Sequence, residues 1–269
     1  MSIFLLEFRN IRKSVLTWTL SVGSIIFLML AFFPSMKTEA MQAIANAKLD
    51  SIDPAILAAM GIKEIPDFTI ITNFFGYILQ FITLALMVFA THQAVSMLIK
   101  EESDGTIEYL YSKPVSRDNI LTQKIAAHVV SFCLMLLVFI VITISGYLAF
   151  SDYSFTKSLK ESLIIYGGIL FVGLIFSSVG FLASSLIRSS RSSAAITIAI
   201  VFGTFVLGAT SAVVKELDFL VYFSPMDWIK AQKLLSDGLK PAEWVIGVGL
   251  ILICTLCAWA RYRRKDLLV

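Results

Sequence analysis

The residue types that could carry redox or metal chemistry are few among the 269 residues, and they lie in apolar surroundings. Cys254 and Cys257 form a C-x-x-C pair, but the pair sits inside an apolar run beside Trp259. Burial disfavours the thiolate, which is the reactive and metal-binding form of cysteine. We therefore interpret both as small packing residues. Cys133 also lies in an apolar run, so the sequence predicts no disulfide framework.

The string closest to a phosphate-binding loop runs from Gly203 to Thr210. Such a loop needs G-x-x-x-x-G-K-[ST], in which the lysine contacts the phosphates and the hydroxyl contacts magnesium. Here Ala209 replaces the lysine, and the string lies within an apolar run. No zincin, serine-triad or metal-ligand spacing occurs either. We therefore expect no enzyme activity and no bound cofactor or metal, and any ATPase would be a separate chain.

Small residues recur at helical spacing in two apolar runs, where they would let neighbouring helices approach closely. These residues are Gly173, Ser177, Gly180 and Ser184 in one run, and Gly203, Thr204, Gly208 and Ser211 in the next. The sequence predicts that both sets are packing surfaces.

Two histidines are the main candidates for a proton relay. Secondary carriers usually place ionisable groups within the membrane. Here the six apolar runs contain no Asp, Glu, Lys or Arg, and His92 and His128 lie near the inner ends of two of them. We interpret each as a hydrogen-bonded packing residue rather than as part of a relay. Transport by this chain would then need another source of energy.

The sequence contains six long apolar runs, and most of the residues discussed above lie within them. The chain is 58% hydrophobic and 15% charged, whereas a soluble domain is about a quarter charged. A helix needs about 20 apolar residues to cross a bilayer, and backbone groups in lipid must be satisfied internally. The sequence therefore predicts a single all-α integral membrane domain over residues 1–269. The predicted spans are 15–33, 69–99, 125–150, 163–187, 194–214 and 244–260.

The lysines and arginines predict the orientation. If the N-terminus is cytoplasmic, the segments on the cytoplasmic side contain more lysines and arginines than the segments on the outer side, although they are shorter in total. This positive-inside asymmetry predicts cytoplasmic termini in a multi-pass protein of the cell membrane. The net charge of +3 is too small to indicate a nucleic-acid partner. The first apolar run is too long for a signal peptide, and residues 34–37 make a poor cleavage site.

Three segments outside the spans have their own patterns. Residues 1–13 are amphipathic and predict an interfacial helix on the inner membrane surface. A frayed tail is the alternative. In the outer segment 34–68, Asp53 can cap a helix that Pro54 begins. The outer segment 215–243 is apolar enough to dip into the membrane interface, with Trp and Tyr at headgroup level.

The inner connection 101–117 carries the strongest local signals. Gly105 is a helix-stop residue, and Ser116 can cap the next helix with Asp118 in its first turn. Between them the sequence predicts a short transverse helix whose apolar residues, including Tyr109 and Leu110, are exposed among charges. Such a surface indicates a docking site for a soluble partner. An ordinary solvated loop is the alternative.

This connection resembles the coupling helix of the type-two permeases of ATP-binding-cassette exporters. That signature is an acidic strip, G-T-[IL]-E-x-L, a proline and [ST]-R. The matching residues are Glu101, Glu102, Gly105, Thr106, Ile107, Glu108, Leu110, Pro114, Val115, Ser116 and Arg117. Segments 53–61, 188–194, 224–225 and 262–266 resemble other parts of the family in the same order. The last departs slightly, because Lys265 precedes the acidic residue.

The resemblance implies a permease that works as a dimer of six-span halves with two cytosolic ATPase subunits, which bind the ATP and magnesium. The second half could be an identical or a different chain. The coupling helix would sit in a groove of the ATPase, with Tyr109, Leu110 and Tyr111 as the expected anchors. The resemblance also implies a bacterial exporter with a membrane-surface helix at residues 1–13. A membrane assembly or regulatory protein, which docks a partner without moving a solute, is the alternative from another class.

A stripe of polar and adaptable residues on the second run could line a substrate path between two permease halves. Its members are Asn73, Tyr77, Gln80, Leu84, Met87 and Thr91. Ordinary hydrogen bonding between helices is the alternative. A path without charges would suit an amphipathic peptide, an antibiotic or a lipid-like compound.

Overall fold

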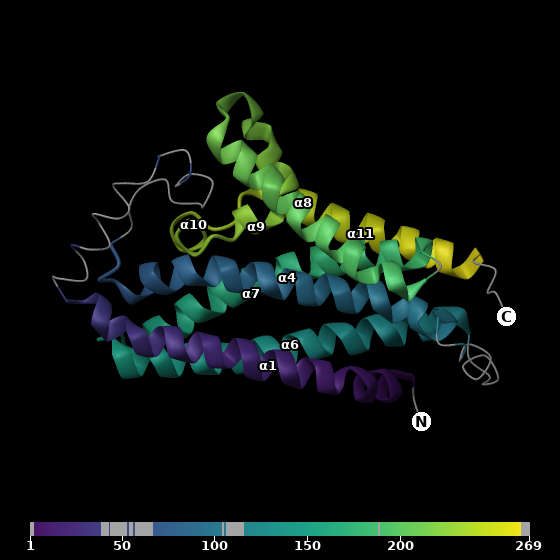
Figure 1. The fold of residues 1–269 in the computed structure, drawn as a ribbon, viewed down its shortest axis with the longest axis horizontal. Helices are drawn as coiled ribbons and strands as arrows, with labels where there is room; N and C mark the ends of the chain where they lie inside the picture. The colour runs from purple at the N-terminus through teal and green to yellow at the C-terminus, as the bar shows by residue number, and fades with distance from the viewer. Residues whose placement is uncertain are drawn as a thin grey trace.

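The computed structural model describes residues 3–38, 43, 53, 56, 67–103, 105, 116–187 and 189–264. Those residues contain helices and connections but no strand (Figure 1). Six of the helices are long and apolar enough to cross a membrane, which confirms the predicted number and fold class. They are α1 (Ile3–Met36), α4 (Ile71–Ser103), α6 (Arg117–Phe150), α7 (Phe155–Leu186), α8 (Ser193–Val213) and α11 (Pro241–Arg264).

Several of these helices extend well beyond the apolar runs that predicted them. The largest difference is in α1, which begins at Ile3 rather than at residue 15. An apolar run marks only the part of a helix that suits hydrocarbon, whereas the helical hydrogen bonds continue through polar turns at either end. The expected membrane-surface helix at residues 1–13 is therefore not a separate element. Its described part forms the first turns of α1, without a break.

The helices are arranged around a buried pair. α4 and α7 lie against each other and bury most of their apolar surface, while α1, α8 and α11 leave most of theirs exposed. α1 runs along α6, and α11 packs on α7 from the other side (Figure 1). Because α4 and α7 contact most of the other helices, they form the centre of the bundle.

The ends of the helices define two ends of the bundle. Both described chain ends, Ile3 and Arg264, lie at one end together with the end of α4 and the start of α6 (Figure 1). We call this the terminal end. The opposite end, which we call the distal end, holds the connection from α8 to α11.

The small-residue stripe on α7 is a packing surface, as predicted. Its four members are buried. A Cβ added at Gly180 would lie 2.9 Å from the Ala94 Cβ and 3.0 Å from the Thr91 carbonyl oxygen of α4. Ser184 Oγ accepts a hydrogen bond from the Leu98 N–H at 3.2 Å. Gly180 and Ser184 therefore set the close approach of α7 to α4, whereas Gly173 and Ser177 face Phe132 and His128 of α6.

The corresponding prediction for α8 holds only in part. Gly208 is buried, and a Cβ there would collide with Ser224 and Asp227 of the distal connection. Gly203 is exposed, with no atom within 4 Å of an added Cβ. Packing within this chain therefore explains Gly208 but not Gly203.

The distal connection is folded rather than a loop. It contains η2 (Lys215–Phe223), α9 (Pro225–Trp228) and α10 (Ala231–Ser236). The Trp228 side chain is fully buried, and its Nε1–H donates to the Val221 carbonyl oxygen at 2.8 Å. The expectation that Trp228 anchors at headgroup level is therefore wrong, because this indole finds its acceptor inside the protein. Phe219 and Phe223 are exposed.

Candidate functional site

The connection between α4 and α6 begins and ends as the sequence predicts. Gly105 has φ +66°, the left-handed conformation that stops a helix at little cost for glycine. Ser116 caps α6, and its Oγ accepts a hydrogen bond from the Asn119 N–H at 3.3 Å. Residues 106–115 lie outside the described part of the chain. The predictions for Thr106, Ile107, Glu108, Tyr109, Leu110, Tyr111 and Pro114 therefore stay predictions.

The α4 side of this connection contacts the turn between α7 and α8. Glu101 and Glu102 belong to the last turn of α4, where only their backbone is described. Ser103 Oγ lies 2.6 Å from Ser190 Oγ, in the short helix η1 (Ser190–Ser192). This hydroxyl pair joins the end of α4 to the start of the α8 segment.

The α6 side is held by the end of α11. The Arg263 guanidinium donates two hydrogen bonds to the Asp118 carboxylate, through Nε and Nη2. The same guanidinium lies 3.8 Å from the centre of the Trp259 ring. Arg117 Nη1 donates to the Arg263 carbonyl oxygen at 3.1 Å. The first turn of α6 and the last turn of α11 are thus fixed to each other. The sequence analysis had considered Arg263 only as part of segment 262–266.

About two turns further along α6, Lys124 forms a buried ion pair with Glu7 of α1. The two groups are 2.9 Å apart, and neither side chain is more than 3% exposed. Lys124 Nζ also donates to the Met97 carbonyl oxygen of α4 at 2.8 Å. The Phe4 N–H donates to Gln123 Oε1 at 2.8 Å in the same region.

The sequence analysis missed this ion pair, because it counted Lys124 only as a basic residue of the inner connection. A signal was present: Lys124 falls on the same helical stripe as Ile120, Leu121, Ala127 and His128, all of which are buried. A lysine on a buried stripe predicts an acidic or carbonyl partner on a neighbouring helix.

The two histidines have different surroundings. His128 is buried, and its Nε2 lies 2.8 Å from Ser177 Oγ. Because the Ser177 O–H donates to the Gly173 carbonyl oxygen, His128 Nε2 must be the donor in this contact. His128 is therefore confirmed as a hydrogen-bonded packing residue. His92 is exposed on α4, so within this chain the expectation that it packs is wrong.

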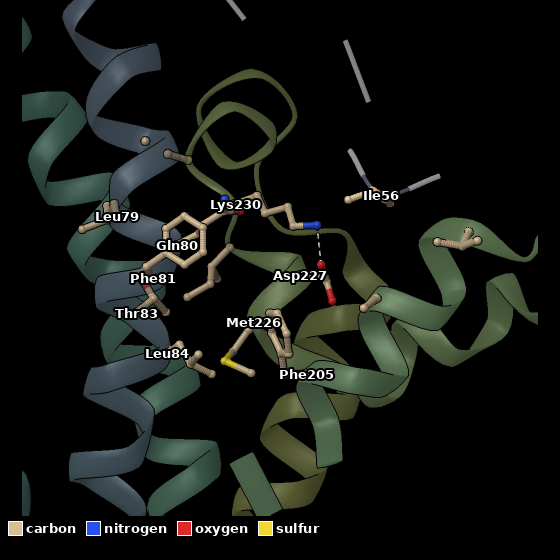
Figure 2. Close-up of a pocket in the computed structure, with 15 residues that line it drawn as sticks. Ile56, Leu79, Gln80, Phe81, Thr83, Leu84, Phe205, Met226, Asp227 and Lys230 are labelled. Carbon is tan, nitrogen blue, oxygen red and sulfur yellow. Dashed lines mark ion pairs between the residues drawn. The ribbon is translucent and has the colours of Figure 1, made fainter. Parts of the chain in front are cut away.

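A cavity of about 480 Å³ opens near the distal end, between α4, α8 and the α9–α10 segment. Figure 2 shows Gln80, Leu84, Phe205 and Met226 around it, with Asp227 and Lys230 at its edge. Its lining is mostly apolar. It has the size of a small-molecule site, since such pockets measure about 300–1,000 Å³.

The predicted stripe on α4 meets this cavity only in its middle. Gln80 and Leu84 line the cavity, whereas Met87 and Thr91 are fully buried in the core. The remaining members of the stripe have local contacts. Asn73 Nδ2 donates to the Asp67 carbonyl oxygen at 3.1 Å, and the Tyr77 ring packs edge-on against Phe68 and Phe81. The role of these residues in a substrate path stays a prediction.

The charged edge of the cavity was not identified from the sequence. Asp227 Oδ1 pairs with Lys230 Nζ at 2.5 Å, and Asp227 Oδ2 accepts from Ser224 Oγ at 2.5 Å. Gly208 of α8 leaves the room that this cluster needs. The spacing of Asp227 and Lys230 along the chain is the one available signal, since it allows a local ion pair.

The six apolar helices with both described ends on one side define a multi-pass α-helical membrane protein, and the residues described contain no cluster suited to a metal ion. The family model described as ABC-2 family transporter protein matches residues 1–267. The chain therefore belongs to the ABC-2 transporter family, as the resemblance predicted. No curated protein matches it. Membership makes the chain a membrane component for transport and implies association with an ATP-binding-cassette ATPase.

Proposed function

We propose that this chain is the transmembrane permease subunit of an ATP-driven exporter. It moves an apolar or amphipathic solute across the cell membrane of a bacterium, and a separate ATPase chain binds and hydrolyses ATP with magnesium. Family membership over residues 1–267 supports the transport role. The observation that carries the proposal is the anchoring of the α4–α6 connection to helices on both of its sides.

The connection docks on the ATPase through residues 106–115, with Tyr109, Leu110 and Tyr111 as buried anchors and Glu102 and Glu108 orienting the contact. Movement of the docked segment would act on two sets of helices. On the α4 side it would act on the start of α8, through the Ser103–Ser190 contact. On the α6 side it would act on α11 and α1, through the Asp118–Arg263 and Glu7–Lys124 ion pairs.

The terminal end faces the cytoplasm in this proposal, because the ATPase is cytosolic and the basic residues favour that side. A second permease half, identical or different, completes the transporter. The solute passes along the members of the α4 stripe that are partly exposed, which are Asn73, Tyr77, Gln80 and Leu84.

The test is the double variant Tyr109→Ala with Leu110→Ala, since docking energy concentrates in a few buried aromatic and aliphatic groups. We expect the ATPase to be lost on copurification in detergent, or its ATP hydrolysis to become independent of solute. Membrane insertion should be unchanged, because the six apolar helices are untouched. The matched control is Ser112→Ala with Lys113→Ala, which alters the same segment without removing an anchor.

The proposal fails if the Tyr109/Leu110 double variant keeps its ATPase and supports normal ATP-driven transport in vesicles. If the wild-type chain binds the ATPase but no solute moves with ATP, the alternative of a docking or assembly protein is favoured instead.

A further inference from the structure

The cavity at the distal end contains a polar group that the protein leaves without a partner. Gln80 projects from α4 into the lining, and its Nε2 is buried with no hydrogen-bond partner among the described residues. A buried amide donor is normally satisfied, by protein or by an ordered molecule. An unsatisfied donor in an otherwise apolar cavity therefore marks the place for an acceptor on a ligand.

The edge of the cavity also offers donors rather than acceptors. The Asp227 carboxylate already receives Lys230 at one oxygen and Ser224 at the other, so its charge is balanced within the protein. An ammonium has three N–H donors, and Asp227 takes one of those of Lys230. Figure 2 shows Gln80 on α4 and the Lys230 side chain extending toward Asp227.

We propose that this cavity binds a small amphiphile whose oxygen acceptors, such as a carbonyl, ester or carboxylate, face Gln80 and Lys230, while its apolar body lies against Leu84, Phe205 and Met226. The inference rests on the proposed transport function and narrows its substrate class. A cavity of about 480 Å³ holds one small molecule and has no room for a folded peptide. A cationic amphiphile without acceptors would leave Gln80 unsatisfied.

The test uses the full chain in detergent and two photoreactive probes with the same twelve-carbon chain, a diazirine-bearing fatty acid and the corresponding amine. The acid should label peptides of α4, α8 and the α9–α10 segment, and the amine should label them at least about tenfold less. Gln80→Met keeps the side-chain size but removes the donor. It should reduce acid labelling about tenfold, the change expected when one buried hydrogen bond of ordinary strength is lost.

The chain offers a matched control on the same helix. Gln93 also has a buried Nε2 without a partner among the described residues, but it does not line the cavity. Gln93→Met should therefore leave labelling unchanged. A second variant, Ala209→Phe, fills the cavity from α8 without touching Gln80, and it should abolish labelling by the acid.

Equal labelling of wild type and Gln80→Met would overturn the inference, as would amine labelling that matches the acid. Labelling that persists in Ala209→Phe would show that the probe binds elsewhere. The labelling measurement needs neither ATP nor the ATPase, so it can overturn this inference even where ATP-driven transport is confirmed. Conversely, loss of ATP-driven transport would leave the labelling result standing.

Discussion

Lys124 Nζ lies 2.9 Å from Glu7 and 2.8 Å from the Met97 carbonyl oxygen, and the lysine side chain is completely buried. One ammonium group therefore joins α6, α1 and α4. These are the helix that follows the 104–115 connection, the N-terminal helix and the helix that precedes the connection. Removing two ions from water is costly, and the arrangement is stable only while each keeps its partner.

Replacing Glu7 by alanine should destabilise the protein strongly. The substitution would leave the Lys124 charge buried without its acidic partner. Removing one partner of a buried ion pair typically lowers the free energy of unfolding by about 3–5 kcal/mol. Unfolding by SDS titration in mixed micelles measures this difference.

Two controls separate burial from charge. The double variant Glu7→Leu with Lys124→Met removes both ions and should recover most of the lost stability, because an apolar pair can replace a buried ion pair. Asp152→Asn breaks the exposed contact with Lys37, 3.6 Å long, and should change stability little. If Glu7→Ala unfolds like the wild type, apolar packing alone holds α1 in place.

Two glycine-to-alanine substitutions should have opposite effects. Gly180→Ala forces a methyl group to within 3.0 Å of the Thr91 carbonyl oxygen and 2.9 Å of the Ala94 Cβ, so α4 and α7 must separate. Overpacking of this kind costs about 1–3 kcal/mol.

Gly203→Ala meets no atom within 4 Å. It should be neutral, or stabilising by up to about 1 kcal/mol from helix propensity. Both variants are compared with the wild type in the same SDS titration. Equal stability of the two would mean that α4 and α7 are not closely packed at Gly180.

Substitution of His92 should leave transport unchanged, whereas substitution of His128 should lower the stability of the protein. His92→Gln should leave ATP-driven transport and its pH profile intact, because His92 is exposed on α4. His128→Leu should lower stability by about 1–3 kcal/mol, since it leaves the buried Ser177 hydroxyl without its donor. Transport assays in vesicles and SDS titration test the two. A folded His92→Gln protein that cannot transport would restore the proton-relay interpretation.

The proposed orientation predicts opposite labelling at two lysine positions. In a background without native cysteines, Lys113→Cys should react with an impermeant maleimide only from the cytoplasm, and Lys48→Cys only from outside. The reason is the excess of basic residues on the side that holds the termini. Reaction of both positions from one side would contradict the six-span topology, in which the span of α4 separates the two positions.

The fold could be predicted from the sequence because each membrane helix is specified by its own apolar run. The two boundary features of the α4–α6 connection were also predictable, since Gly105 and Ser116 act through local backbone geometry. The Asp118–Arg263 pair was not, because its members are 145 residues apart and nothing local indicates which helix ends meet. The sequence indicated the cavity only through Gln80 and Leu84 of α4, since its other walls come from distant segments.

The continuous helix α1 also has a consequence for the order in which the protein is made. Phe4 and its hydrogen-bond acceptor Gln123 are 119 residues apart, and α1 packs mainly along α6 rather than along α4. At a synthesis rate of 5–20 residues per second, α1 waits roughly 6–24 seconds for α6 to emerge from the ribosome. Glu7 must stay at the membrane surface during that interval, because its lysine does not yet exist. The first helix to enter the bilayer thus takes its final place only after the third has been inserted.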